Sequence, residues 1–168
     1  MNPSVTEIPR PAPRVAKELL KSNGFLLARM GIGFKMRAIA LFEQEGFEHY
    51  DYNVLAILAE GTPETQATIA TSLNVDPSRL VAVLDSLEQR GLVARRRDPQ
   101  DRRRHVVTIT ADGKRDLAKL RELTKKLENE YFAPFDEGER EILRDLLLRL
   151  ACHNDPRCAS AVEPPPAA

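Results

Sequence analysis

Arginine is concentrated in one short stretch of this chain, between Arg90 and His105. Seven arginines and two aspartates lie there, an excess of five positive charges, although the whole 168-residue chain has a formal net charge of zero. A compact cationic segment on a neutral protein suits the phosphate backbone and the narrow, negative minor groove of DNA. The arginines are Arg90, Arg95, Arg96, Arg97, Arg102, Arg103 and Arg104.

The elements around this stretch predict how the arginines are held. Val93–Arg97 and His105–Ile109 have strand-forming composition and are joined by a loop over residues 98–104. Before them, Asp76-Pro77 is a cap followed by proline, which predicts a helix that runs to Arg90 and ends at Gly91.

Two further helices are expected upstream of this one. The first runs over Asp51–Glu60 and is closed by Gly61, and the second begins at a Thr62-Pro63 cap and runs through Leu73. A tight turn at Asn74-Val75 separates the second from the helix that begins at Pro77. Helix, helix, turn, helix and a two-stranded ribbon is the order of a winged helix-turn-helix.

The Pro77–Arg90 helix is expected to enter the major groove of DNA. Leu80, Leu84 and Leu87, with Val81 beside them, are expected to pack inward, and the opposite stripe holds Arg79, Ala82, Val83 and Ser86. Arg79 suits bidentate contact with guanine, Ala82 suits a thymine methyl, and Ser78 and Ser86 suit weaker contacts. Gln66, on the preceding helix, is also a candidate DNA contact.

Long amphipathic helices flank the winged module. Apolar residues spread around much of a helix over Val15–Gln44, interrupted near Asn23-Gly24, and this favours a subunit interface. A coiled-coil-like seam follows over 112–131, and an Asp136-Glu139 capping box starts the last helix. We expect a disordered tail over 1–13, a dimerisation helix over 14–46, the DNA-binding domain over 47–111, dimerisation helices over 112–153 and a disordered tail over 154–168.

Composition narrows the class of protein. A 42% hydrophobic and 30% charged chain of this length is typical of a globular domain, and its two cysteines do not form a disulfide scaffold. No secretory signal or membrane-spanning run is recognised, so we expect a soluble, cytoplasmic protein with reduced thiols. No catalytic motif, metal-ligand set or phosphate-binding loop is found, which argues against an enzyme and against a bound cofactor.

Three motifs in this order are specific when taken together. They are Asp98-Pro99-Gln100-Asp101-Arg102-Arg103, then Val107-Thr108-Ile109-Thr110 with Gly113, and the helix ending from Leu84 to Val93. In this combination the chain resembles the MarR family of bacterial transcription regulators, from about Phe25 to Leu150.

The resemblance implies a mainly α fold with a small β-wing, in which the N- and C-terminal dimerisation helices of two chains interlock. It implies that Arg103 reaches the minor groove and that Asp101 pairs with basic neighbours to hold the loop. Arg95, Arg97, Arg102 and Arg104 would then contact phosphates. Relatives often carry arginine at positions 82 and 86, which are Ala82 and Ser86 here, so the operator of a relative does not transfer to this chain.

Family members often respond to small anionic or phenolic molecules, bound where the dimerisation helices meet the winged module. The residues that would line such a pocket here are Phe34, Arg37, Leu41, His49 and Tyr52. Arg37 or His49 would pair with the charge of an anionic ligand. Phe34, Leu41 and Tyr52 also fit an ordinary core, and His49 also fits a turn residue whose hydrogen bonds are made within the chain. We therefore predict a dimeric transcriptional repressor that binds double-stranded DNA and is released from it by such a ligand.

Two alternatives stay open on the sequence alone. One is a dimeric module that binds nucleic acid or an acidic protein without any ligand response. The other is a thiol or metal sensor that acts through Cys152 and Cys158, with His153 between them.

Overall fold

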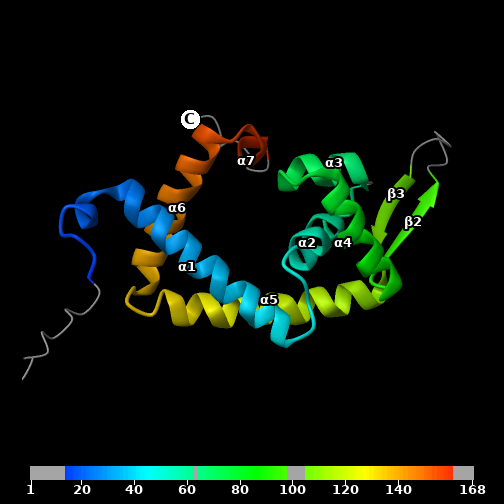
Figure 1. Ribbon diagram of the computed structural model, residues 1–168, viewed down its shortest axis with the longest axis horizontal. Coiled ribbons are helices and arrows are strands. Elements are labelled where there is room, and N and C mark those ends of the chain that lie inside the picture. Colours follow the sequence, from blue (N-terminus) through cyan, green and yellow to red (C-terminus); the bar gives the residue numbers. More distant parts are fainter. Residues whose placement is uncertain (1–13, 63, 98–104, 161–168) are drawn as a thin grey trace, which may run out of the picture. The chain divides into compact units, whose positions relative to one another are not determined.

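The computed structural model describes residues 14–62, 64–97 and 105–160 of the chain (Figure 1). Contacts divide the chain into two compact units, residues up to Met36 and residues from Arg37 onward, and the boundary falls inside the helix α1. In chain order the elements are η1 (Leu19–Lys21), α1 (Asn23–Gln44), α2 (Asp51–Ala59), β1 (Glu64–Thr65), α3 (Gln66–Leu73), α4 (Pro77–Gln89), β2 (Val93–Arg97), β3 (His105–Ile109), α5 (Ala111–Tyr131), α6 (Glu137–Asn154) and α7 (Pro156–Ser160).

The first unit contains η1 and most of α1. The interruption expected near Asn23-Gly24 lies at Ser22, whose extended backbone (φ −91°, ψ 115°) separates η1 from α1. The Ser22 hydroxyl then accepts a hydrogen bond from the Phe25 amide at 3.2 Å, which satisfies one of the free donors at the start of α1.

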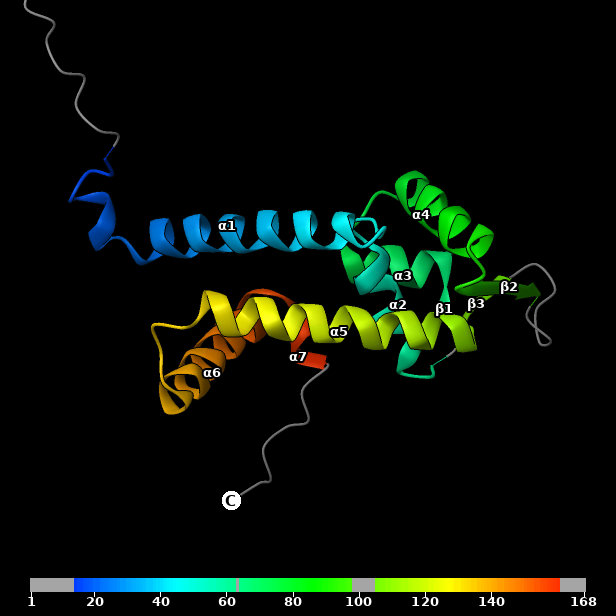
Figure 2. The ribbon, with the colours of Figure 1, turned by 90° about the horizontal axis from the view of Figure 1, so that it is seen from below.

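The core of the second unit lies among α2, α3, α4, the sheet and the start of α5. Leu55, Ile69, Leu84 and Leu120 have no exposed surface, and each comes from a different helix. Burial of several large aliphatic side chains at one place stabilises a small module mainly through the hydrophobic effect. Figure 2 shows α4, the β2–β3 hairpin and the start of α5 at the same end of this unit.

The expected start of α3 is wrong. Thr65, and not Thr62, caps the helix: its hydroxyl accepts from the Thr68 amide at 3.2 Å, and its own amide donates to the Thr68 hydroxyl at 2.8 Å. The physical reason is that Glu64 and Thr65 are extended, because they pair with Val107 and Val106 of β3. The Thr62-Pro63 pattern is a local signal, so it could not reveal that the next two residues pair with the distant strand β3.

The sheet has three antiparallel strands in the order β1-β3-β2, one more than the expected ribbon. The bounds expected for β2 and β3 are confirmed, and their register pairs Val93 with Ile109 and Arg97 with His105. The pairing brings the first turn of α5 against the start of β2. A Cβ on Gly113 would lie 2.1 Å from the carbonyl oxygen of Leu92, so only glycine fits there.

Two capped helices, α5 and α6, follow the sheet. The Thr110 hydroxyl accepts from the Gly113 amide at 3.0 Å and starts α5, whose Leu117, Leu120 and Leu127 are buried as the seam predicts. The Asp136-Glu139 capping box of α6 is confirmed, with reciprocal hydrogen bonds of 2.9 and 3.0 Å.

Part of the expected C-terminal tail is helical, which corrects the expectation of disorder from Asn154. The short helix α7 begins at Pro156, and the Asp155 carboxylate accepts from the Arg157 amide at 3.0 Å. Asp155-Pro156 therefore repeats the cap-and-proline signal seen at Asp76-Pro77. The disorder was predicted from the proline-rich composition of the whole segment, and this local helix-start signal was not considered.

Candidate nucleic-acid interface

The helix α4 is capped as its sequence predicts. The Asp76 carboxylate accepts hydrogen bonds from the amides of Ser78, at 2.9 Å, and Arg79, at 3.4 Å, and from the Ser78 hydroxyl. The Ser78 hydroxyl first, and then the two amides, lowers the pKa of Asp76 below its ordinary value of 3.8. The first turn of α4 is therefore held by a carboxylate that stays ionised.

One face of α4 is buried and the other is open. Leu80, Val83, Leu84 and Leu87 are buried, whereas Val81 is 40% exposed. The expected places of Val81 and Val83 are therefore wrong. Val83 follows Leu80 by three residues and precedes Leu87 by four, which puts it on the buried face of a helix with 3.6 residues per turn.

The exposed face of α4 carries two of the predicted DNA contacts, Ser78 and Ala82, with Val81 between them. Val81 was predicted to face inward, although correct helical spacing would have placed it outward. An exposed valine beside Ala82 adds a second methyl-bearing side chain that can contact a thymine methyl.

The other two predicted contacts on α4 have partners inside the protein. The Arg79 guanidinium lies over the ring of Tyr50, 5.0 Å from its centroid, and Arg79 remains exposed. Ser86 is half-buried, and its hydroxyl donates to Glu48 Oε1 at 3.4 Å. Both therefore face the segment between α1 and α2.

The strand β2 follows α4 in the chain, and Arg95 of β2 forms ion pairs with two carboxylates of α4. Its guanidinium is 2.5 Å from Asp85 Oδ1 and 3.7 Å from Glu88 Oε2, and its amide donates to Glu88 Oε1 at 3.0 Å. Arg95 is therefore anchored to α4, whereas Arg96 and Arg97 are exposed near the end of the strand. Asp101, Arg102, Arg103 and Arg104 lie outside the described residues.

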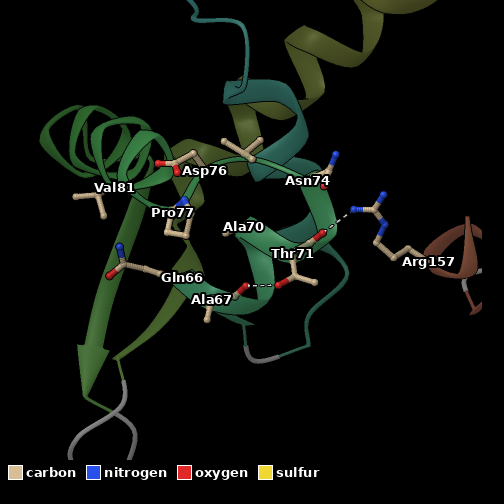
Figure 3. Close-up of a pocket in the computed structure, with 10 residues that line it drawn as sticks. Gln66, Ala67, Ala70, Thr71, Asn74, Asp76, Pro77, Val81 and Arg157 are labelled. Carbon is tan, nitrogen blue, oxygen red and sulfur yellow. Dashed lines mark hydrogen bonds between the residues drawn. The ribbon is translucent and has the colours of Figure 1, made fainter.

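A groove of about 760 Å³ lies between α3 and the start of α4 (Figure 3). Gln66, a predicted DNA contact, lines it together with Val81. At its far end Arg157 of α7 donates from Nη1 to the carbonyl oxygen of Thr71 at 2.9 Å. The same arginine donates two side-chain hydrogen bonds to the Asp155 carboxylate. These hydrogen bonds are the main reason that the pKa of Asp155 lies below its ordinary value.

Known proteins share this arrangement. The sequence profile of the MarR family matches residues 48–105, which contain α2 to β2. A protein of Thauera aromatica, named for transcriptional regulation of the hcr operon, is 30% identical over an alignment of 136 residues that covers 76% of this chain and 82% of that protein. The chain belongs to the MarR family.

Solved structures support the same assignment. CouR from Rhodococcus jostii RHA1 bound to p-coumaroyl-CoA is 29% identical to this chain with a TM-score of 0.68, covering 81% of this chain and 96% of that one. CouR bound to a 23-mer DNA duplex is 28% identical with a TM-score of 0.74, covering 83% and 99%. This MarR-family chain is thus a DNA-binding transcriptional regulator with a winged helix-turn-helix, and not an enzyme.

The residues predicted to line a ligand pocket make separate contacts in this regulator. The Arg37 guanidinium lies 5.2 Å from the centroid of Tyr131, Tyr52 lies 5.7 Å from Phe42, and His49 lies 4.5 Å from Tyr50. Leu41 is half-buried in the second unit, and Phe34 belongs to the first unit. Neither of the two cavities described for the chain is lined by any of these five residues.

The second cavity lies between α5 and α6 and measures about 740 Å³. Its walls are mainly apolar, from Phe132, Leu143, Leu147 and Leu148, and Arg140 stands at its edge with Asn129 as a hydrogen-bond partner at 3.2 Å. This cavity was not predicted from the sequence, because leucines at helical spacing indicate an apolar face but not which part of that face stays uncovered.

Cys152 and Cys158 are both free and half-buried. Across residues 14–62, 64–97 and 105–160, no group of three or more potential ligands among His, Cys, Asp and Glu is placed to hold a metal ion. In the same ranges no helix is long and apolar enough to cross a membrane.

Proposed function

We propose that this regulator is a dimeric repressor that binds an inverted-repeat operator and is released by a small anionic or phenolic ligand. The observation that carries the DNA-binding part is the open face of α4 beside the anchored, arginine-bearing strand β2. A helix whose first turns present an open face suits the major groove, and a basic hairpin next to it suits the phosphates and the minor groove.

The proposed contacts divide into base readout and backbone positioning. Ser78, Arg79, Ala82 and Ser86 would contact base edges, and Gln66 would approach the backbone from the start of α3. Arg79 and Ser86 would have to exchange their partners Tyr50 and Glu48 for DNA. On the wing, Arg103 would enter the minor groove with Asp101 as its brace, and Arg95, Arg97, Arg102 and Arg104 would meet phosphates. Arg95 would have to exchange Asp85 and Glu88 for a phosphate.

Exposed apolar faces support the proposed dimer. On α6, Ile142 is 62% and Leu146 54% exposed, and on α1 Ile32 is 64% and Met36 60% exposed. Large apolar side chains grouped on one helix mark an interaction surface. We propose residues 14–46 and 112–153 as the dimerisation segments and residues 47–111 as the DNA-binding domain.

The proposed ligand response rests on a relative and on the residues near the start of α2. CouR has been solved with p-coumaroyl-CoA and with DNA. In this chain Phe34, Arg37, Leu41, His49 and Tyr52 are the proposed ligand contacts. An anion would pair with Arg37 in place of the ring of Tyr131.

A gel shift tests the function directly. The probes are the duplexes that flank the protein's own coding sequence and a random duplex of the same length, at two salt concentrations. Selective binding that persists at the higher salt is expected, because base contacts depend less on counterion release than phosphate contacts do. Equal affinity for all duplexes contradicts the proposal.

The ligand response is tested on the same complex. Small phenolic carboxylates are added to the protein bound to its selected duplex, and release is expected with at least one of them. If DNA is bound selectively and none releases it, the chain is a regulator without this response, and the proposed class of ligand is wrong.

A further inference from the structure

Asp51 lies at the start of α2, where a carboxylate is common, but its complete burial is unusual. Within the described part of the chain it is the charged side chain that is fully buried, with no exposed surface. Its Oδ2 accepts hydrogen bonds from the Glu48 amide at 2.9 Å and from Arg90 Nη1 at 2.6 Å, whereas its buried Oδ1 accepts none. A buried carboxylate is unfavourable unless it is paired, and an oxygen without a hydrogen bond adds to that cost.

Arg90 is the partner, and it marks the end of the helix proposed to read DNA. It is the C-cap of α4, followed by Gly91 in the left-handed region (φ +72°) and closed by a 2.9 Å bond from the Leu92 amide to the Leu87 carbonyl. Its guanidinium also lies over the ring of buried Phe47, 5.0 Å from the centroid. Two partners from one segment therefore fix its direction.

The same segment follows one side of α4. Tyr50 lies under Arg79 and Glu48 accepts from Ser86, as described above. Positions 79, 86 and 90 are separated by seven and four residues, so they share one face of the helix. The segment over residues 47–51, which we call the α4 rest, thus contacts this face near its start, its middle and its end.

The contact at the end differs from the other two. The Arg79 and Ser86 contacts involve exposed or half-buried groups and can be exchanged for DNA. The Asp51–Arg90 pair is buried at its carboxylate, and the arginine side chain is 30% exposed. The α4 rest also contacts α5, because Lys119 Nζ lies 5.8 Å from the centroid of the Phe47 ring. The same ammonium group pairs with Glu45, just before this segment, at 2.6 Å.

We infer that Asp51 and Arg90 are positioning residues that set the orientation in which α4 meets the major groove. The inference rests on the proposed function, since it concerns how α4 is presented to DNA. Buried ion pairs are often no more stabilising than apolar side chains of similar size, and we therefore assign this pair a role in fixing one arrangement of α4. Base readout requires close alignment of donors and acceptors, whereas phosphate contacts tolerate a tilted helix.

The test compares selective with non-selective binding. The wild-type protein is first used to enrich a duplex from a pool with a randomised centre, and the probes are that duplex and a random duplex of equal length. For Asp51→Asn and Arg90→Gln, the ratio of the two affinities is expected to fall at least about tenfold, the effect of losing one base contact, while random-duplex affinity is unchanged.

Controls separate positioning from folding. Circular dichroism confirms the folded fraction of each variant, and Asp112→Asn removes one partner of the exposed Asp112–Arg115 pair, with no effect expected. Arg90→Gln alters a partly exposed side chain and decides the question where Asp51→Asn does not fold. Arg90→Lys is expected to recover part of the ratio, because an ammonium group can still reach Asp51.

Three results would overturn the inference. Folded Arg90→Gln with a wild-type ratio shows that the pair sets nothing at the DNA interface. An equal fall in both affinities shows a purely structural role. If the wild-type protein enriches no sequence, the proposed function fails first, and the inference falls with it before any variant is tested.

Discussion

At the scale of the residue, Asp76 connects the turn of the helix-turn-helix to the first turn of α4. It accepts from two amides and one hydroxyl there, and this lowers its pKa below 3.8. A carboxylate at a helix start also favours the positive end of the helix dipole. The position of Ser78 relative to DNA therefore depends on the charge of its neighbour.

We predict that Asp76→Ala lowers the melting temperature at neutral pH and that this deficit shrinks in acid. Because the folded-state pKa is lowered, ionised Asp76 stabilises the fold above its unfolded value of about 3.8, and the stabilisation is lost as the pH falls through the folded-state pKa. Thermal unfolding followed by circular dichroism across this range measures it. Asp145→Ala, which removes an exposed carboxylate inside α6, is the control, and a deficit that stays constant with pH contradicts the account.

Arg103 supplies the second prediction at this scale. Arg103→Ala is expected to weaken binding to all duplexes and to lower the salt dependence by about one unit of log–log slope, because one positive charge that displaces counterions from the duplex is lost. Fluorescence anisotropy over a salt series measures both effects. Arg115→Ala removes an exposed arginine from α5 and should leave the slope as it is. An unchanged affinity and slope for Arg103→Ala would exclude Arg103 from the proposed DNA contacts of the wing.

At the scale of the element, α4 separates stability from recognition on its two faces. Leu84→Ala removes a fully buried side chain and should lower the free energy of unfolding by about 2–5 kcal/mol. Val81→Ala, on the open face, should change it by less than about 0.5 kcal/mol while altering the preferred DNA sequence. Denaturant unfolding and duplex selection on both variants check this. Similar stability losses in the two would contradict the assignment of faces.

The sequence predicts most elements here and fewer of their contacts. Local signals such as Asp76-Pro77, Gly91 and the Asp136-Glu139 box act within a few residues, so the caps of α4 and α6 follow from them. The start of α3 does not, because Glu64 pairs with Val107, 43 positions away. For the same reason nothing in the sequence showed that Asp85 would hold Arg95, or Asp51 would hold Arg90.

At the scale of the whole molecule, exposed apolar surface is the main feature that one chain leaves unexplained. We predict that Leu146→Glu, which places a charge on the apolar face of α6, shifts the protein from dimer to monomer and lowers duplex affinity, because two linked modules bind two half-sites together. Sedimentation equilibrium measures the mass. Glu141→Gln, exposed on the same helix, is the control. An unchanged dimer would exclude this face, and a monomeric wild type would exclude the dimer.

The central claim is that two copies of this chain read one operator through paired wings and recognition helices. Hydroxyl-radical footprinting of the wild-type protein on its enriched duplex tests it most directly. The account predicts two protected regions related by inverted symmetry, with centres about one helical turn (~34 Å) apart. A single protected region, or uniform protection along the duplex, would contradict it.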